Sequence, residues 1–173
     1  MWILPWAFRF VAAHPGLVLG LSLVSALGRA VQLGGLGPVG GTTSAFLEVV
    51  VEGARVLLFL GVIGLGGVAE GLRTVASAFA RPPGGWRESG RRVRARLRAE
   101  WRALMADIAG FGLIAFAINA AIEAVAAPGA YPRIFLLKNL TVIPLTIVFQ
   151  CGLLLFMSGR AGSARPAAPS PVG

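Results

Sequence analysis

The sequence predicts an all-α, polytopic membrane protein: a four-helix transmembrane bundle with an N-terminal interfacial arm and a basic amphipathic cytoplasmic helix. Hydrophobic residues make up 56% of the 173 residues and charged residues only 13%, whereas about 25% of the residues of a soluble domain are typically charged. The mean hydropathy is +0.78. Four apolar stretches approach the length of about 20 residues that a helix needs to cross a bilayer. This composition excludes an ordinary soluble globular domain.

The N-terminal arm is rich in aromatic residues. Trp2, Trp6 and Phe10 recur every four residues, which places them on one helical face where their rings would lie at the level of the lipid headgroups. The Pro15-Gly16 pair is expected to separate this arm from the first span. A cleaved signal peptide is the competing interpretation, with residues 17–27 as its apolar core, but the arm lacks the usual cluster of positive charge.

Four spans are predicted within a single transmembrane domain of residues 1–160. They cover residues 16–36, 46–68, 108–127 and 135–158. Pairs of small residues four positions apart are expected to permit close helix contacts, within the bundle or between copies. These pairs are Gly16/Gly20, Gly67/Gly71 and Ala106/Gly110. Pro144 is expected to bend the fourth span about one turn below its start.

A basic loop, residues 70–107, joins the second and third predicted spans. After the break at residues 82–85 its apolar residues fall on about a third of a helical wheel, namely Val93, Leu97, Trp101, Leu104, Met105 and Ile108. Arginines cover the rest of that helix, namely Arg91, Arg92, Arg94, Arg96, Arg98 and Arg102. The favoured interpretation is contact with anionic lipid and a role in setting topology, and the alternative is docking of a protein partner. Nucleic-acid binding is disfavoured because no aromatic stacking platform accompanies the arginines.

Positive charge predicts the orientation. The N-terminal arm, the basic loop and the tail together carry 12 Lys and Arg residues, whereas the opposite face carries only Arg133 and Lys138. The side richer in Lys and Arg is expected to be cytoplasmic, which places both termini there. Residues 161–173, rich in Pro, Ala and Ser, are expected to form a disordered tail. The 15 Arg against one Lys are typical of a GC-rich bacterial genome, so we expect a bacterial cytoplasmic (inner) membrane.

Ionisable residues interrupt the predicted spans. The uncharged runs of the second and third spans are only 14 and 15 residues long, so these helices must carry charge into the bilayer or to its edge. Threading the helices alternately brings these residues together in the outer half of the bundle. The predicted cluster comprises Arg29, Gln32, Glu48, Glu52, Arg55, Asn119, Glu123 and Asn139. We expect Arg29 and Arg55 to pair with Glu48, Glu52 and Glu123, because unpaired charge facing lipid is costly.

Two interpretations of this cluster remain open. It is either an interhelical network that selects which helices pack together or a polar site for a small ligand, an ion or a proton. We expect no cofactor and no metal, because one Cys, one His and no phosphate-binding glycine loop leave too few ligands.

Three classes of function follow. The leading class is a non-enzymatic accessory or scaffold subunit of a membrane assembly, with a protein partner or further copies of itself. The alternative is a component of a transporter for a small solute or ion. The third is an intramembrane enzyme acting on lipid, which is disfavoured because no nucleophile and base pair is recognisable around Ser22, Ser25 or Cys151.

Overall fold

The computed structural model describes residues 3–33, 37, 40–80, 83–125 and 131–158, and helices account for nearly all of them. Trp2, Leu36, Ala127 and residues 161–173, which belong to the predicted arm, spans and tail, lie outside the described residues. The described part contains seven helices and no strand. In chain order these are α1 (Ile3–Ala13), α2 (Pro15–Gln32), α3 (Gly41–Ile63), α4 (Val68–Phe79), α5 (Pro83–Val125), α6 (Tyr131–Leu140) and α7 (Val142–Ser158). The all-helical class predicted from the sequence is therefore confirmed.

Three helical segments are long and apolar enough to cross a membrane: Pro15–Gln32, Arg87–Ala124 and Arg133–Ser158, the last formed by α6 and α7 together. Helix α3 has 23 residues but is not one of these three segments, because it carries three charged residues, Glu48, Glu52 and Arg55. The three apolar segments suggest a membrane protein.

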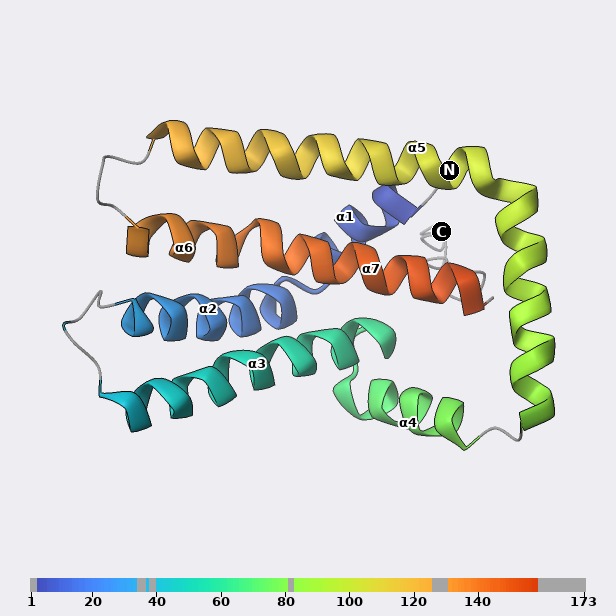
Figure 1. The fold of residues 1–173 in the computed structure, drawn as a ribbon, viewed down its shortest axis with the longest axis horizontal. Helices are drawn as coiled ribbons and strands as arrows, with labels where there is room; N and C mark the ends of the chain where they lie inside the picture. Colours follow the sequence, from blue (N-terminus) through green and yellow to red (C-terminus); the bar gives the residue numbers. More distant parts are fainter. Residues whose placement is uncertain (1–2, 34–36, 38–39, 81–82, 126–130, 159–173) are drawn as a thin grey trace, which may run out of the picture.

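The long helices run side by side along the long axis of the molecule (Figure 1). Helix α2 packs between α3 and α6, α3 also contacts α7, and the second half of α5 lies against α6 and α7. Helix α5 bends at Glu100, whose φ of −119° and ψ of 16° are not helical. Its first part, residues 83–100 and hereafter the basic segment, therefore crosses one end of the parallel helices (Figure 1).

The N-terminal arm, predicted as a short interfacial segment, buries its aromatic face in the protein core instead of leaving it free for lipid headgroups. Trp6 and Phe10 of α1 are 6% and 5% exposed and pack in one cluster with Val148 and Leu155 of α7. A Cβ at Gly152 would lie 2.7 Å from the ring of Trp6. The aromatic face of α1 thus packs on α7, because a glycine there leaves room for the indole.

The second predicted span has shifted bounds. Helix α3 ends at Ile63, and the chain reverses through Leu65 and Gly66, whose φ values are 54° and 108°. The left-handed conformation at Gly66 suits a residue without a side chain. The ring of His14, at the junction of α1 and α2, fills the space in front of Gly66, since a Cβ there would lie 2.5 Å from Nε2.

Helix α4 was missed by the sequence analysis, which included its residues in a loop. It packs back onto the end of α3. Gly71 of α4 lies so close to the backbone of Leu60 that a Cβ would be 1.8 Å from the carbonyl oxygen. This contact joins the two helices through their main chains.

The predicted apolar stripe of the basic loop does not stay on one face. Leu104 is buried against Ile3 and Phe149, and Leu97 packs beside this cluster. Trp101 and Met105, in contrast, are 55% and 48% exposed. The bend at Glu100 breaks the helical period on which the predicted stripe depended.

The break between α6 and α7 falls at Thr141, three residues before Pro144. Proline has no N–H to donate to the carbonyl of residue 140 and its ring crowds that turn. The fourth predicted span is thus interrupted close to Pro144, between two helices of 10 and 17 residues.

We expect Gly71→Ala to destabilise the protein by about 2 kcal/mol or more, because the added methyl group meets a main-chain carbonyl that cannot move without shifting α3. Gly112→Ala is the matched control, since a Cβ there meets nothing within 4 Å, and we expect it to change stability by less than about 0.5 kcal/mol. Thermal unfolding in detergent, followed by labelling of the buried Cys151 thiol, measures both. Equal stability of the two variants would contradict the close contact between α3 and α4.

Candidate functional site

A bidentate ion pair joins the ends of α2 and α3. Arg29 donates from Nη1 and Nη2 to the two carboxylate oxygens of Glu48, at 2.6 and 2.7 Å. Gln32, one turn further along α2, accepts from Arg29 at 2.9 Å and donates to Glu48 at 3.1 Å. It also donates to the backbone carbonyl of Ser44 at 2.9 Å. Such fork-shaped pairs have fixed geometry and are stronger than neutral hydrogen bonds.

The network continues along α3 and reaches α6. Glu52 accepts from Arg29 at 3.4 Å and from Arg55 at 2.5 Å. Arg55 donates its Nη2 to the side-chain oxygen of Asn139 at 3.0 Å. Asn139 is 2% exposed and donates to the carbonyl of Phe135 at 2.8 Å. We call the six residues Arg29, Gln32, Glu48, Glu52, Arg55 and Asn139 the polar network.

The polar network carries two positive and two negative charges and links three helices. The side chains of Arg29 and Arg55 are 27% and 24% exposed, and those of Glu48 and Glu52 are 45% and 48% exposed. The guanidinium groups thus lie between the helices, with the carboxylates nearer the surface. The Nε of Arg55 is buried and has no hydrogen-bond acceptor in the described part of the chain. Burial of an N–H group without an acceptor lowers the stability of the folded protein.

Two of the predicted cluster residues do not join the polar network. Glu123 forms an ion pair with Lys138 of α6, at 2.7 Å, instead of with Arg29 or Arg55. Asn119 donates to the carbonyl of Ala115 in its own helix. The reason is packing: in the described part of the chain α5 contacts α1, α6 and α7, and neither α2 nor α3. The predicted convergence of all eight residues is therefore wrong for these two.

Sequence reasoning also missed a buried carboxylate. Asp107 of α5 is 2% exposed, and its Oδ2 accepts a hydrogen bond from the backbone N–H of Ile3 at 3.2 Å. Ile3 is the first residue of α1, where backbone N–H groups lack helical partners and negative charge is favourable. The only sequence signal was one acidic residue at the start of an apolar run.

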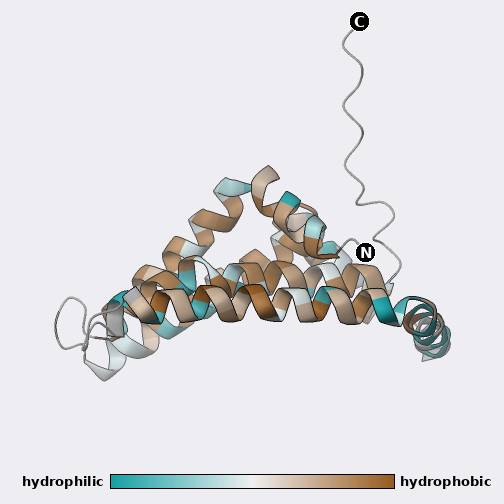
Figure 2. Ribbon diagram, turned by 90° about the horizontal axis from the view of Figure 1, so that it is seen from above, coloured by the Kyte–Doolittle hydropathy of each residue, from teal (hydrophilic) through white to brown (hydrophobic). Residues whose placement is uncertain are grey.

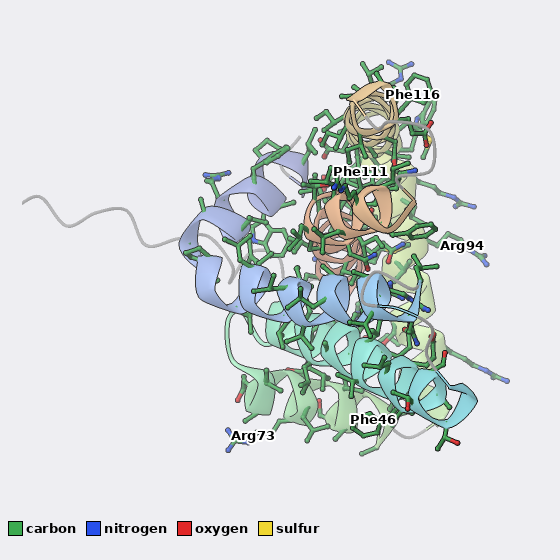
Figure 3. All side chains as sticks on the ribbon, turned by 90° about the vertical axis from the view of Figure 1, so that its left-hand side faces the viewer. Phe46, Arg73, Arg94, Phe111 and Phe116 are labelled. Atoms are coloured by element: carbon green, nitrogen blue, oxygen red, sulfur yellow. The ribbon has the colours of Figure 1, made fainter. Side chains whose placement is uncertain are left out.

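All six arginines predicted to contact lipid or a partner are exposed. Arg92 forms an ion pair with Glu88, one turn earlier on the same helix. Arg96 donates to the carbonyl of Phe156, near the end of α7, at 3.0 Å. Arg94 projects away from the bundle (Figure 3). Arg102 lies over the ring of Trp101, 5.9 Å from its centre. Arg96 thus fastens the basic segment to the α7 end.

The candidate nucleophiles are engaged in helix packing. Ser22 donates to the carbonyl of Val18 at 2.5 Å, and Ser25 donates to the carbonyl of Val51 at 3.4 Å. Cys151 is fully buried, with its Sγ 3.9 Å from the carbonyl of Phe59. Among the described residues, no three His, Cys, Asp or Glu side chains gather closely enough to hold a metal ion.

Comparison with protein-family models, with curated proteins and with solved structures gives no match for this chain.

We expect Arg29→Gln to lower the thermal midpoint more than Glu48→Gln does, because Arg29 serves Glu48 and Glu52 together. The double variant should lose less than the sum of the two single variants, since neither charge is then left without its partner. The matched control is the exposed pair Glu70 and Arg73 on α4, for which Glu70→Gln and Arg73→Gln should change the midpoint little. Additive effects at Arg29 and Glu48 would show that this pair does not couple the helices.

Proposed function

We propose that this chain is a small multi-pass membrane protein that acts as a non-enzymatic accessory or scaffold subunit of a larger membrane assembly. The observation that carries the proposal is the pairing of charges in the polar network. The Nη groups of Arg29 and Arg55 donate hydrogen bonds to Glu48, Glu52 and Asn139. These contacts connect α2, α3 and α6. Side chains arranged in this way hold helices in register, which is a structural role.

We further propose four crossings, with α3 as the crossing in addition to the three apolar segments. The charges of α3 would make insertion of this helix alone into lipid unfavourable in free energy, but Arg29 of α2 pairs with two of its carboxylates. Helix α3 also lies alongside α2 in the same layer of parallel helices (Figure 1). Four crossings leave both termini on one side, and the excess of Lys and Arg on that side favours the cytoplasm of a bacterial cell.

The surfaces offered to a partner are the basic segment and the outward face of α2. Gly16 and Gly20 are exposed and a Cβ at either meets nothing within 4 Å. Leu19 and Leu23 on the same helix are 53% and 47% exposed. A face of small residues beside leucines permits close packing against a helix of another chain. Of the other predicted small-residue pairs, Gly71 packs against the backbone of Leu60, and a Cβ at Gly110 would lie 3.4 Å from Leu4. Ala106 is exposed.

A scaffold should co-purify with its partner. We expect purification of the full chain from its native membranes in mild detergent to recover a stoichiometric partner, and Gly16→Ile with Gly20→Ile to release that partner without loss of folded chain, because the larger side chains hold the helices apart. Gly112→Ile on the open face of α5 is the matched control and should retain the partner. Recovery of a lone, stable monomer would contradict the proposal.

Transport is the second candidate, and the exposure of Glu48 and Glu52 favours it, since both carboxylates are reachable from one side of the network. Transport predicts that Glu52→Gln abolishes flux in proteoliposomes while the protein still folds and inserts. The scaffold proposal predicts a reduced yield of folded protein and no flux to abolish. Flux that depends on Glu52 in a well-folded protein would therefore replace the scaffold proposal with transport.

A reporter fusion tests the orientation. We expect a fluorescent protein fused after Gly173 to be fluorescent, because the tail lies in the cytoplasm, and alkaline phosphatase inserted between α5 and α6 to be active on the other side. Exchanging the two reporters is the control and should abolish both the fluorescence and the phosphatase activity. The opposite pattern would contradict the proposed topology.

A further inference from the structure

An open groove lies where the basic segment of α5 meets the end of α7. Its volume is about 550 Å³. Helix α5 contributes the polar wall and α7 the apolar one. The residues that line it are Glu88, Ser89, Arg92, Val93, Leu154, Met157 and Ser158. No residue of the polar network lines this groove. The basic segment and the end of α7, which form it, lie at the opposite end of the parallel helices from the start of α3 (Figure 1).

Contacts within the protein hold the wall of the groove that the basic segment forms. Arg96, one turn beyond Arg92, donates to the carbonyl of Phe156 at 3.0 Å, and Leu97 packs against the apolar cluster that contains Phe156. These two contacts fasten the basic segment across the end of α7. Lysine and arginine side chains near the end of a helix are favoured by its unpaired carbonyls. The separation of the two walls is therefore set by contacts within the protein.

The groove has a polar part and an apolar part, as a phospholipid has a polar headgroup and apolar acyl chains. Arg92 and Ser89 offer N–H and O–H donors, and the contact with Glu88 engages one nitrogen of the Arg92 guanidinium, Nη2. Leu154 and Met157 offer an apolar surface, with Leu154 47% exposed. Seen along its axis, the basic segment is mostly hydrophilic, at the end of long helices that are mostly hydrophobic (Figure 2). In a bilayer crossed by these helices, headgroups would meet acyl chains at that end.

Charge decides between the possible occupants. Residues 87–102 hold seven arginines and two glutamates, so the groove lies in a strongly positive field that favours an anion. The C-terminal tail, which starts beside Ser158, carries Arg160 and Arg165 and no acidic side chain, so its charge opposes binding here. Inorganic phosphate would leave the apolar wall uncovered.

We propose that this groove binds one anionic phospholipid, with the phosphodiester at Arg92 and Ser89 and the acyl chains running over Leu154 and Met157. The inference goes beyond the scaffold proposal and stands without it, because it uses neither the polar network nor a protein partner. It distinguishes a discrete site from general attraction of the arginines to a charged leaflet.

The test is a titration of the full chain in neutral detergent with phosphatidylglycerol, followed by native mass spectrometry. We expect the first phosphatidylglycerol to bind more tightly than phosphatidylcholine. Arg92→Ala should weaken that binding about fivefold, the contribution of one basic residue near an anionic surface. Arg94→Ala removes the same charge from a side chain that projects away from the bundle (Figure 3), and it should change the affinity less than about twofold. Glu88→Gln should tighten binding, because it frees Arg92 from a competing carboxylate.

Several results would overturn the proposal. Equal losses in Arg92→Ala and Arg94→Ala would show diffuse attraction without a site. Displacement of the lipid by millimolar inorganic phosphate would show a phosphate site without a lipid. Tighter lipid binding after deletion of residues 160–173 would identify the tail as the occupant. Should Arg92→Ala fail to purify, Ser89→Glu places a carboxylate in the groove and is expected to abolish the preference for phosphatidylglycerol, whereas an unchanged preference would refute the site.

Discussion

The contact between α2 and α3 is the constraint on which the rest of the structure depends. Gly28 lets Val51 approach so closely that a Cβ at residue 28 would lie 2.5 Å from it. Arg29 follows Gly28 directly, and Glu48 and Glu52 flank Val51. The residues that bring the two backbones close together are therefore neighbours of the residues whose charges neutralise each other. A helix that carries charge among apolar neighbours needs such a partner, because removing an ion from water is costly.

Glycines and breaks in the helices then position everything else. Gly152 leaves room for Trp6, so α1 enters the core, and Gly71 brings α4 against the backbone of Leu60. Phe111 and Phe149 stack with their ring centres 4.3 Å apart and attach α5 to α7, whereas Phe116 on the outer side of α5 remains 71% exposed (Figure 3). Glycines at these contacts let the helices approach closely, and large apolar residues such as Phe116 remain on the surface.

The two ends of the helices differ in whether their charged side chains form ion pairs between helices. At one end the carboxylates and guanidinium groups pair between helices. At the other, the basic segment carries many arginines and few acids, and only Arg92 and Arg96 have described contacts within it or with α7. Paired charge holds helices together and offers little to a ligand, whereas unpaired positive charge attracts anions. The proposed structural role and the proposed binding role thus lie at opposite ends of the helices.

The sequence by itself determined the helical class, three of the four predicted apolar segments, the breaks at Pro15 and near Pro144, and the common face of Glu48, Glu52 and Arg55, because helical periodicity and proline geometry are local properties. Only the tertiary structure decided which partners those charges take. Glu123 meets Lys138 because α5 packs on α6 and never reaches α2. The burial of Trp6 likewise depends on α7, which is far away in the chain, and no local pattern records which helices become neighbours.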